Sequence, residues 1–240
     1  MNRRAAIVSA GMTVLATSFM SGVQAATPKQ IERGIRVAFV LGPNSNLIDV
    51  AGPFEVFSDA QMPVKPGPPP HGLDYYPDDN SQAFVPYTVS DAKEALTIGS
   101  SLTVLPTYTY ADAPVPQVIV MGAQSGQTPA KVAWIREMSK SADVVMSVCT
   151  GAFLLAKTGL LDGLRATTHH DYYDAFEKAY PNVTLVRGPR FVDNGKYKTA
   201  GGLTSGFELA LHVVEQYYGD QRASMLARYL EYNRMSERPA

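Results

Sequence analysis

Cysteine is almost absent from this sequence, which has one, Cys149, among 240 residues. A single cysteine cannot form an internal disulfide, so a disulfide-stapled scaffold is excluded. One-sided charge is missing too: 21 basic and 22 acidic residues give a net charge of −1, and no basic block points to nucleic acid. Beyond the first residues no apolar run is long enough to cross a bilayer. These absences do not identify a partner; the motifs described below lead us to expect a small-molecule substrate or ligand.

The N-terminus is typical of a cleavable export signal. Arg3-Arg4 precedes a mostly apolar stretch at 5–23, and Val23-Gln24-Ala25 carries small residues where a signal peptidase cuts. Cleavage after Ala25 is predicted, followed by a flexible lead-in at 26–34. A membrane anchor is the alternative, but hydroxyl residues interrupt the stretch and no stop-transfer charges follow. We expect a periplasmic or secreted chain without stable membrane insertion, through either the Sec or the twin-arginine route.

Short apolar strands alternate with amphipathic helices through most of the remaining chain. Strands are predicted at 35–41, 83–89, 95–98, 102–106, 117–121, 143–148 and 165–168, helices at 47–57, 129–140, 153–157, 172–180 and 203–218, and a hairpin around Asn194-Gly195. This alternation predicts an α/β fold with parallel βαβ units and helices on both faces of the sheet. Residues 62–81 are rich in proline and lack an apolar period, which indicates a long insertion. We expect one domain over 35–240.

Cys149 lies between a predicted buried strand and a helix, at the edge where parallel sheets form their sites. Such a turn resembles the nucleophile elbow of serine hydrolases. We expect the N-terminus of the following helix to favour the thiolate over the thiol. The alternative is a buried, unreactive cysteine, which is common.

Asp49 lies at the start of the first predicted helix, within LIDVAGPFEVF. It can serve that helix alone, by satisfying backbone donors and the dipole. It can also face Cys149 across the end of the sheet and move a proton in a reaction. The sequence leaves both alternatives open.

His169 and His170 follow the predicted strand at 165–168, so one of them can lie near the thiol as a base or an imidazolium. The alternative is a structural histidine at a strand end. We predict no metal site, because the pair lacks acidic or cysteine companions at ligand spacing.

Gly122-Ala123 ends the strand QVIVM. A turn with so little side chain exposes backbone N–H groups. Together with the Thr150 amide, these groups are candidates to hold an oxyanion. Glycines also end strands for steric reasons, so this signal is weak by itself.

Several segments together resemble one family. They are DVVMSVCTGAFLLAKTGLLDG, RATTHH, FVDNGKYKTAGGLTSGFELALHVVE and IDVAGPFEVF, and they span roughly residues 35–219. The sequence resembles the ThiJ/PfpI superfamily of the class I glutamine-amidotransferase-like fold. Within it, the similarity is greatest to isonitrile hydratases and to the amidase-like sensor domains fused to AraC-type regulators.

The resemblance implies a flavodoxin-like three-layer sandwich, usually dimeric, with a mostly parallel central sheet and Cys149 on its nucleophile elbow. Asp49 matches the assisting acid of isonitrile hydratases, and His169 matches the common TTH histidine. Thr150 replaces the histidine of the peptidase-like branch, which disfavours a peptidase. His170 stands where tryptophan is frequent and forms part of the expected substrate-binding wall.

In the same comparison, Ala123 replaces the second glycine of an oxyanion turn. If its φ were positive, alanine would be strained there by about 1 kcal/mol or more. About twenty residues follow position 219, too few for a helix-turn-helix domain, so we expect no DNA binding by this chain alone.

We therefore expect a cofactor-independent, cysteine-dependent hydratase or hydrolase of small carbon–nitrogen substrates, similar to isonitrile hydratase and homodimeric. The first alternative is a redox or small-ligand sensor with the same fold. The second is a partner-binding relic with an inert thiol. Sequence alone does not name the substrate.

Overall fold

The computed structural model describes residues 34–60 and 83–234. The predicted signal at 1–25, nearly all of the lead-in and the insertion at 62–81 lie outside the described residues. Among the described residues, no helix is long and apolar enough to span a membrane.

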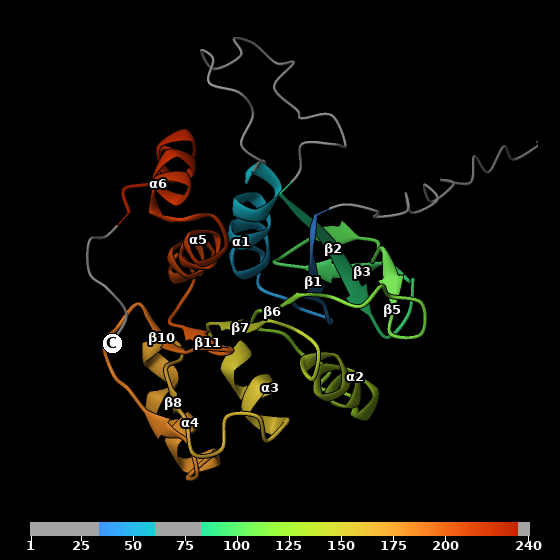
Figure 1. Cartoon of the computed structure of the whole chain (residues 1–240). Coiled ribbons are helices and arrows are strands. Elements are labelled where there is room, and N and C mark those ends of the chain that lie inside the picture. The colour runs from blue at the N-terminus through green and yellow to red at the C-terminus, as the bar shows by residue number, and fades with distance from the viewer. Residues whose placement is uncertain (1–33, 61–82, 235–240) are drawn as a thin grey trace, which may run out of the picture.

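A seven-stranded sheet with the order β10-β11-β7-β6-β1-β2-β5 organises the described chain (Figure 1). Its neighbouring strands are parallel except β10 and β11, which form the predicted antiparallel hairpin. The strands are β1 (Ile35–Val40), β2 (Phe84–Ser90), β3 (Leu96–Ile98), β4 (Leu102–Val104), β5 (Tyr108–Thr109), β6 (Val118–Met121), β7 (Val144–Val148), β8 (Arg165–Ala166), β9 (Thr184–Leu185), β10 (Phe191–Asn194) and β11 (Tyr197–Ala200). Two small separate sheets pair β3 with β4 and β8 with β9.

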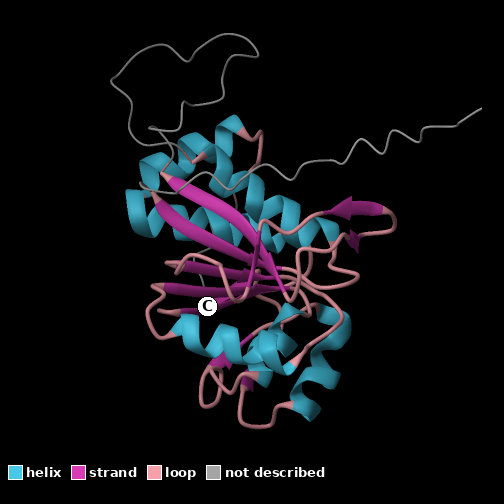
Figure 2. Ribbon diagram, turned by 90° about the vertical axis from the view of Figure 1, so that its right-hand side faces the viewer, coloured by secondary structure: helices cyan, strands magenta, loops and turns pink. Residues whose placement is uncertain are grey.

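Helices cover both faces of this sheet, which makes three layers (Figure 2). They are α1 (Leu47–Asp59), α2 (Pro129–Ser139), α3 (Gly151–Lys157), the 3₁₀ helix η1 (His170–Tyr172), α4 (Tyr173–Ala179), α5 (Ser205–Tyr218) and α6 (Asp220–Tyr229). One apolar cluster joins α1, α5 and α6 to the sheet, and a second joins α2, α3 and α4 to its other face. The predicted mostly parallel α/β sandwich is confirmed.

Capping residues fix where the site-bearing helices begin. The Asn46 side chain accepts a hydrogen bond from the Ile48 N–H at 3.1 Å, which starts α1. The Thr128 hydroxyl accepts one from the Lys131 N–H at 3.2 Å, ahead of Pro129 at the first turn of α2. The start of α1 therefore stands where the polypeptide leaves β1, at the carboxyl end of the sheet.

Several elements differ from the sequence prediction, among them the two-residue strands β5 and β9, which were not predicted. The strand expected at 165–168 ends after Ala166 and pairs only with β9. Beyond it, the Thr167 N–H donates to the Thr199 hydroxyl, and the Thr168 hydroxyl donates to the Cys149 carbonyl. These bonds tie the segment to the end of the main sheet instead of extending a strand. Helix α6 was not predicted, because Gly219 ends α5 with φ +82° and α6 begins at the next residue.

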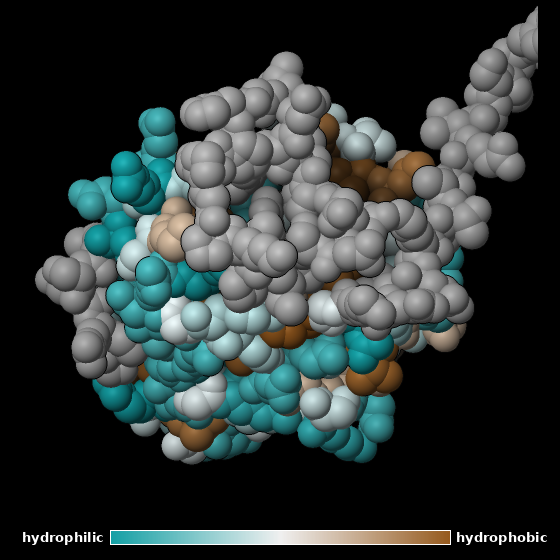
Figure 3. All heavy atoms as spheres, turned by 45° about the horizontal axis from the view of Figure 1, so that its top comes forward, coloured by the Kyte–Doolittle hydropathy of each residue, from teal (hydrophilic) through white to brown (hydrophobic). Residues whose placement is uncertain are grey.

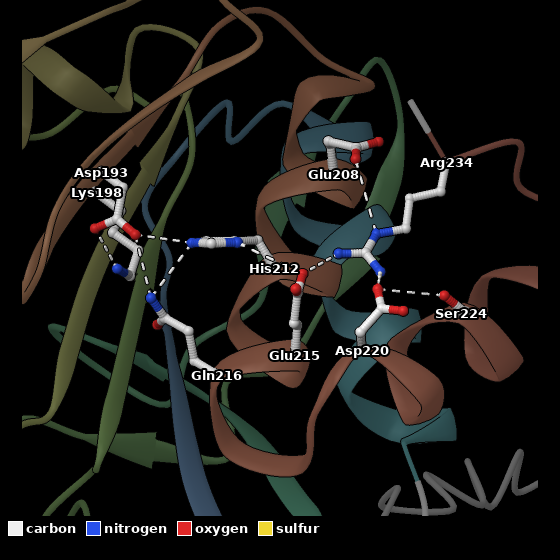
Figure 4. A network of polar contacts seen from close by, with 9 residues as sticks. All are labelled: Asp193, Lys198, Glu208, His212, Glu215, Gln216, Asp220, Ser224 and Arg234. Carbon is white, nitrogen blue, oxygen red and sulfur yellow. Dashed lines mark hydrogen bonds and ion pairs between the residues drawn. The ribbon is translucent and has the colours of Figure 1, made fainter. Parts of the chain in front are cut away.

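A polar network fastens α5 to the β10–β11 hairpin and to the residues after α6 (Figure 4). Asp193 accepts from the fully buried Lys198 ammonium at 2.5 Å and bonds the His212 ring at 2.8 Å. Arg234 pairs with Glu215 and with Asp220. His212 is therefore structural. In the view of Figure 3, the described surface is mostly hydrophilic, apart from an apolar group at the upper right and smaller ones elsewhere.

Candidate active site

Cys149 occupies the turn between β7 and α3 with φ +58°, a left-handed conformation that is rare outside glycine. Such a conformation costs about 1–2 kcal/mol, so its surroundings must enforce it. The Cys149 N–H donates to the Gly201 carbonyl at 2.8 Å, and the Cys149 carbonyl accepts from the Thr168 hydroxyl at 2.9 Å. The predicted elbow is therefore present, and hydrogen bonds of its N–H and its carbonyl hold its backbone in place.

Close packing under the elbow requires Gly151. A Cβ at this position would come within 2.3 Å of the Met121 carbonyl oxygen, so any side chain there would push α3 away from β6. The elbow thus rests directly on the end of the neighbouring strand.

The thiol of Cys149 is buried, with 5% of the residue exposed. Burial first, and then the nearby Asp49 carboxyl, raise its pKa to about 11, against the lowering effect of the backbone N–H groups of Thr150 and Leu203. The expectation that the helix N-terminus makes a thiolate is therefore wrong for the resting protein. Helix α3 has only seven residues, and the N–H of Thr150 lowers the pKa of the thiol by less than burial raises it.

Asp49 lies in the first turn of α1 and is completely buried. Its Oδ2 accepts a hydrogen bond from the Ala123 N–H at 2.9 Å, and the carboxyl lies near enough to the Cys149 thiol for each group to shift the pKa of the other. Oδ1 accepts no hydrogen bond from a nitrogen or oxygen donor of the described chain. Because Asn46 caps the helix and Asp49 bonds a distant turn, the carboxyl does not serve its own helix. The structure brings it together with Cys149.

Burial raises the pKa of Asp49 to about 6, against the lowering effect of the Ala123 amide and the Cys149 thiol. At neutral pH the pair therefore holds one proton: the carboxyl is mostly ionised and the thiol is protonated. Moving that proton from sulfur to oxygen yields a thiolate beside a carboxylic acid. The two groups titrate as a coupled pair, since each shifts the other.

The Gly122-Ala123 turn positions Asp49. Because the Ala123 N–H is bound to Asp49, it is not available as an oxyanion donor while this bond lasts. Gly122 is needed for space, as a Cβ there would lie 2.6 Å from the Asp49 Cβ. Neither residue has a positive φ, so the strain expected for Ala123 is absent.

The donors that do reach the sulfur are the N–H groups of Thr150 and Leu203. Thr150 was predicted from the sequence, whereas Leu203 was missed. Leu203 has φ +53° and follows Gly201-Gly202, a glycine pair that could have signalled a tight backbone approach. A negative charge developing on or near the sulfur would meet these two donors.

A buried lysine supports the turn from behind and was also missed. The fully buried Lys131 ammonium donates to the Gln124 side-chain oxygen at 2.8 Å. The Gln124 amide group donates to the carbonyls of Val40 at 2.9 Å and Gly122 at 3.3 Å. Burial lowers the pKa of Lys131 to about 8. Lys131 lies one helical turn before the core residue Ile135, and that spacing was the available signal.

His169 is mostly buried but does not pair with the thiol. Its ring packs on Gly202, and its Nδ1 accepts the Asp171 N–H at 3.2 Å. In the described chain no hydrogen bond joins this ring to Cys149. The predicted histidine–thiol contact is therefore not formed, and His169 stands as a satisfied histidine next to the elbow. The His170 side chain stacks on His169 and is 73% exposed.

The fold and this site define an α/β sandwich protein with a cysteine on a strand-to-helix elbow and a buried aspartate against its thiol. The chain belongs to the DJ-1/PfpI family, which matches residues 35–216. The resemblance seen in the sequence is confirmed.

Among relatives, the isonitrile hydratase of Pseudomonas putida is 31% identical over 207 residues, which cover 82% of this chain and 78% of that protein. The HTH-type transcriptional regulator CdhR of Pseudomonas aeruginosa is 33% identical over 111 residues, or 46% of this chain and 33% of the regulator. A crystal structure of a ThiJ/PfpI family protein from Pseudomonas syringae superposes with a TM-score of 0.69 at 21% identity, over 86% of this chain and 78% of that one. The last comparison supports the fold.

Proposed function

We propose that this protein is a cysteine-dependent hydratase of small carbon–nitrogen substrates, with isonitriles as the substrate class. The observation that carries the proposal is the buried Asp49–Cys149 pair, which holds one proton between a carboxyl and a thiol. Hydration of an isonitrile needs a proton and a nucleophile delivered to the same carbon. The relation to a curated isonitrile hydratase supports this substrate class.

The reaction begins when the Asp49 carboxylate takes the thiol proton and passes it to the terminal carbon of the isonitrile. The thiolate attacks that carbon, so one C–H and one S–C bond form and a thioimidate remains on Cys149. Water then adds to the same carbon, with the Asp49 carboxylate accepting its proton. The S–C bond breaks, the nitrogen and the sulfur end protonated, and an N-substituted formamide leaves. No oxidant or cofactor enters this balance.

Two backbone N–H groups are placed to stabilise the negatively charged stages of this reaction. The N–H groups of Thr150 and Leu203 face the sulfur and lower the pKa of the thiol, so they stabilise the thiolate when it forms. Asp49 is the acceptor we propose for the thiol proton, because its carboxyl and the Cys149 thiol shift each other's pKa. In this scheme the Cys149 thiolate, which is the nucleophile, forms in the same step in which Asp49 becomes the acid that protonates the substrate.

Incubating the purified chain with a small alkyl isonitrile, and measuring the formamide by chromatography, tests the proposal. We expect product from the native protein and none from Cys149→Ala or Asp49→Asn. Glu55→Gln is a matched control, because it removes an exposed carboxylate from the same helix. Equal formamide from native protein and Cys149→Ala, or none from either while both are folded, would overturn the assignment.

A sensor is the second candidate, because regulators such as CdhR share about a third of their length with this chain. In this function Cys149 is oxidised by peroxide, or a small ligand occupies the space above it. Mass spectrometry after titration with hydrogen peroxide distinguishes the two candidates. Ready formation of sulfinic acid together with no isonitrile turnover would favour the sensor.

We also propose that the protein is exported, on the basis of the sequence pattern around Arg3-Arg4 and Ala25. Cell fractionation and N-terminal sequencing of the mature chain test this. A first residue of Ala26 is the expected result, and an intact Met1 in the cytoplasm would contradict it. Light scattering on the same preparation decides between a monomer and the homodimer expected from the resemblance.

A further inference from the structure

Three consecutive side chains converge at the beginning of η1. The His170 Nε2 lies 3.2 Å from the Asp171 Oδ1, and the His169 Nδ1 lies 3.7 Å from the Asp171 Oδ2. The two imidazole rings are stacked, with centroids 4.4 Å apart. One ligand atom from each of the three residues fits within a mutual distance of 4.8 Å. The carboxylate thus lies beside a nitrogen of each ring.

These spacings suit a tetrahedral metal ion. Zinc binds imidazole nitrogen and carboxylate oxygen at about 2.0–2.2 Å, which places two ligands of a tetrahedron about 3.4 Å apart. The distance from the His170 Nε2 to the Asp171 Oδ1, 3.2 Å, is close to that value, and the His169 Nδ1 lies 3.7 Å from the other carboxylate oxygen, Oδ2. Two histidines and one carboxylate form a known zinc donor set that keeps a fourth position for water.

The arrangement is partly preorganised. The ring of His169 lies on Gly202, where a Cβ would approach its Cδ2 to 2.2 Å, and the edge of Tyr172 packs against it. Its side chain is 17% exposed, whereas those of His170 and Asp171 are 73% and 69% exposed. An ion therefore has access from solvent to a ligand held by the protein. It has to displace one contact, the 3.2 Å hydrogen bond from the Asp171 N–H to the His169 Nδ1.

We propose that His169, His170 and Asp171 bind a divalent transition-metal ion, with Zn²⁺ the best fit to the donor set and spacing. The sequence predicts no metal site because the histidines lack an acidic companion at ligand spacing, but in the structure Asp171 lies beside both rings. The site is next to the elbow, because Thr168 bonds the Cys149 carbonyl and Gly202 precedes Leu203, whose N–H faces the sulfur. Metal binding would fix the two segments that frame the thiol. The proposal does not depend on the hydratase activity.

Calorimetric titration of the untagged full chain with zinc chloride near neutral pH tests the proposal. We expect one saturable site that His170→Ala and Asp171→Asn each weaken by at least about tenfold, the lower range found when even an outer-shell partner is lost. Because both side chains are exposed, these variants keep the fold, and circular dichroism verifies it. His212→Gln is the matched control, since it removes a histidine that also lies beside carboxylates.

The thiol is the competing zinc ligand in this chain, so Cys149→Ser separates the two explanations. Unchanged zinc affinity in Cys149→Ser and in His212→Gln supports the site at His169. Loss of binding in Cys149→Ser, equal affinity in native protein and His170→Ala, or no saturable heat from the native protein would each overturn it.

Discussion

Replacing Asp49 with asparagine separates the electrostatic effect of the buried carboxyl from its shape. The raised pKa means that the fold favours the protonated acid. An acid with a raised pKa contributes stability that is fully present below its unfolded pKa of 3.8 and is lost as pH rises through about 6. Asparagine keeps an acceptor for the Ala123 N–H and carries no charge. Asp49→Asn should therefore gain stability relative to the native protein as pH rises.

The size of the effect follows from the pKa values. One pKa unit corresponds to about 1.4 kcal/mol, so a rise from 3.8 to about 6 is equivalent to about 3 kcal/mol, most of it between pH 4 and pH 8. The new amide Nδ2 in place of Oδ1 can lack a partner, at a cost of about 1–3 kcal/mol. This offset is the same at every pH. The pH dependence of the difference is thus the diagnostic quantity.

Urea unfolding of both proteins at several values between pH 4 and pH 8 gives the difference in unfolding free energy. We expect it to shift by about 2–3 kcal/mol in favour of Asp49→Asn from the acid to the alkaline end. Glu55→Gln reports what loss of an exposed charge on α1 does by itself. A difference in unfolding free energy that does not change with pH, or that changes in favour of the native protein, would refute the inference that ionised Asp49 destabilises the fold.

Four further outcomes are expected. Iodoacetamide should alkylate Cys149 slowly at neutral pH and faster toward pH 11. Asp49→Asn should accelerate alkylation at neutral pH, because the carboxylate no longer raises the pKa of the thiol. Equal alkylation rates in the native protein and Asp49→Asn would contradict this. Isonitrile turnover should rise with pH through about 6, since only the ionised Asp49 can take the thiol proton, and a profile flat from pH 5 to 7 would not fit. Gly122→Ala should lower turnover by about tenfold or more in a chain that still folds, because its Cβ would displace Asp49; kinetics and a melting curve on one sample check it. Lys131, whose lowered pKa favours its neutral form in the fold, should make the native protein more stable as pH rises from about 8 to 10.5, and Lys131→Met should lack this gain in denaturant titrations.

The fold was predictable because its signals are local and strong. The runs IRVAFV, VIVM and VVMSV are short and almost entirely apolar, as expected for strands buried on both faces, and a helix follows each of them. Elements that depend on tertiary contacts were not predictable. Helix α6 is polar overall and packs through a few side chains such as Leu226, so its apolar signal is weak.

The positions of the site residues could be predicted from the sequence, but the pKa values of their side chains could not. The carboxyl ends of β1 and β7 place Asp49 and Cys149 at one edge of the sheet, as the sequence indicated. The pKa of the thiol depends on how much water the packed site excludes, and that quantity has no local signature. The role of the Ala123 amide is similar, because its partner lies 74 positions away in the chain.

The same proton that would serve the proposed hydratase reaction works against fast redox sensing. Thiols react with peroxide as thiolates, so a buried thiol whose pKa is raised to about 11 is a slow target at neutral pH. A substrate that accepts a proton at carbon changes this balance, because the proton leaves the pair at the moment the sulfur attacks. Under the proposed function, the resting thiol is thus protected from an oxidant and would be activated only by a substrate that can be protonated. A slow rate of peroxide oxidation, measured with and without a bound isonitrile analogue that cannot react, is what this reasoning requires; rapid oxidation in the free protein would assign the elbow to sensing instead.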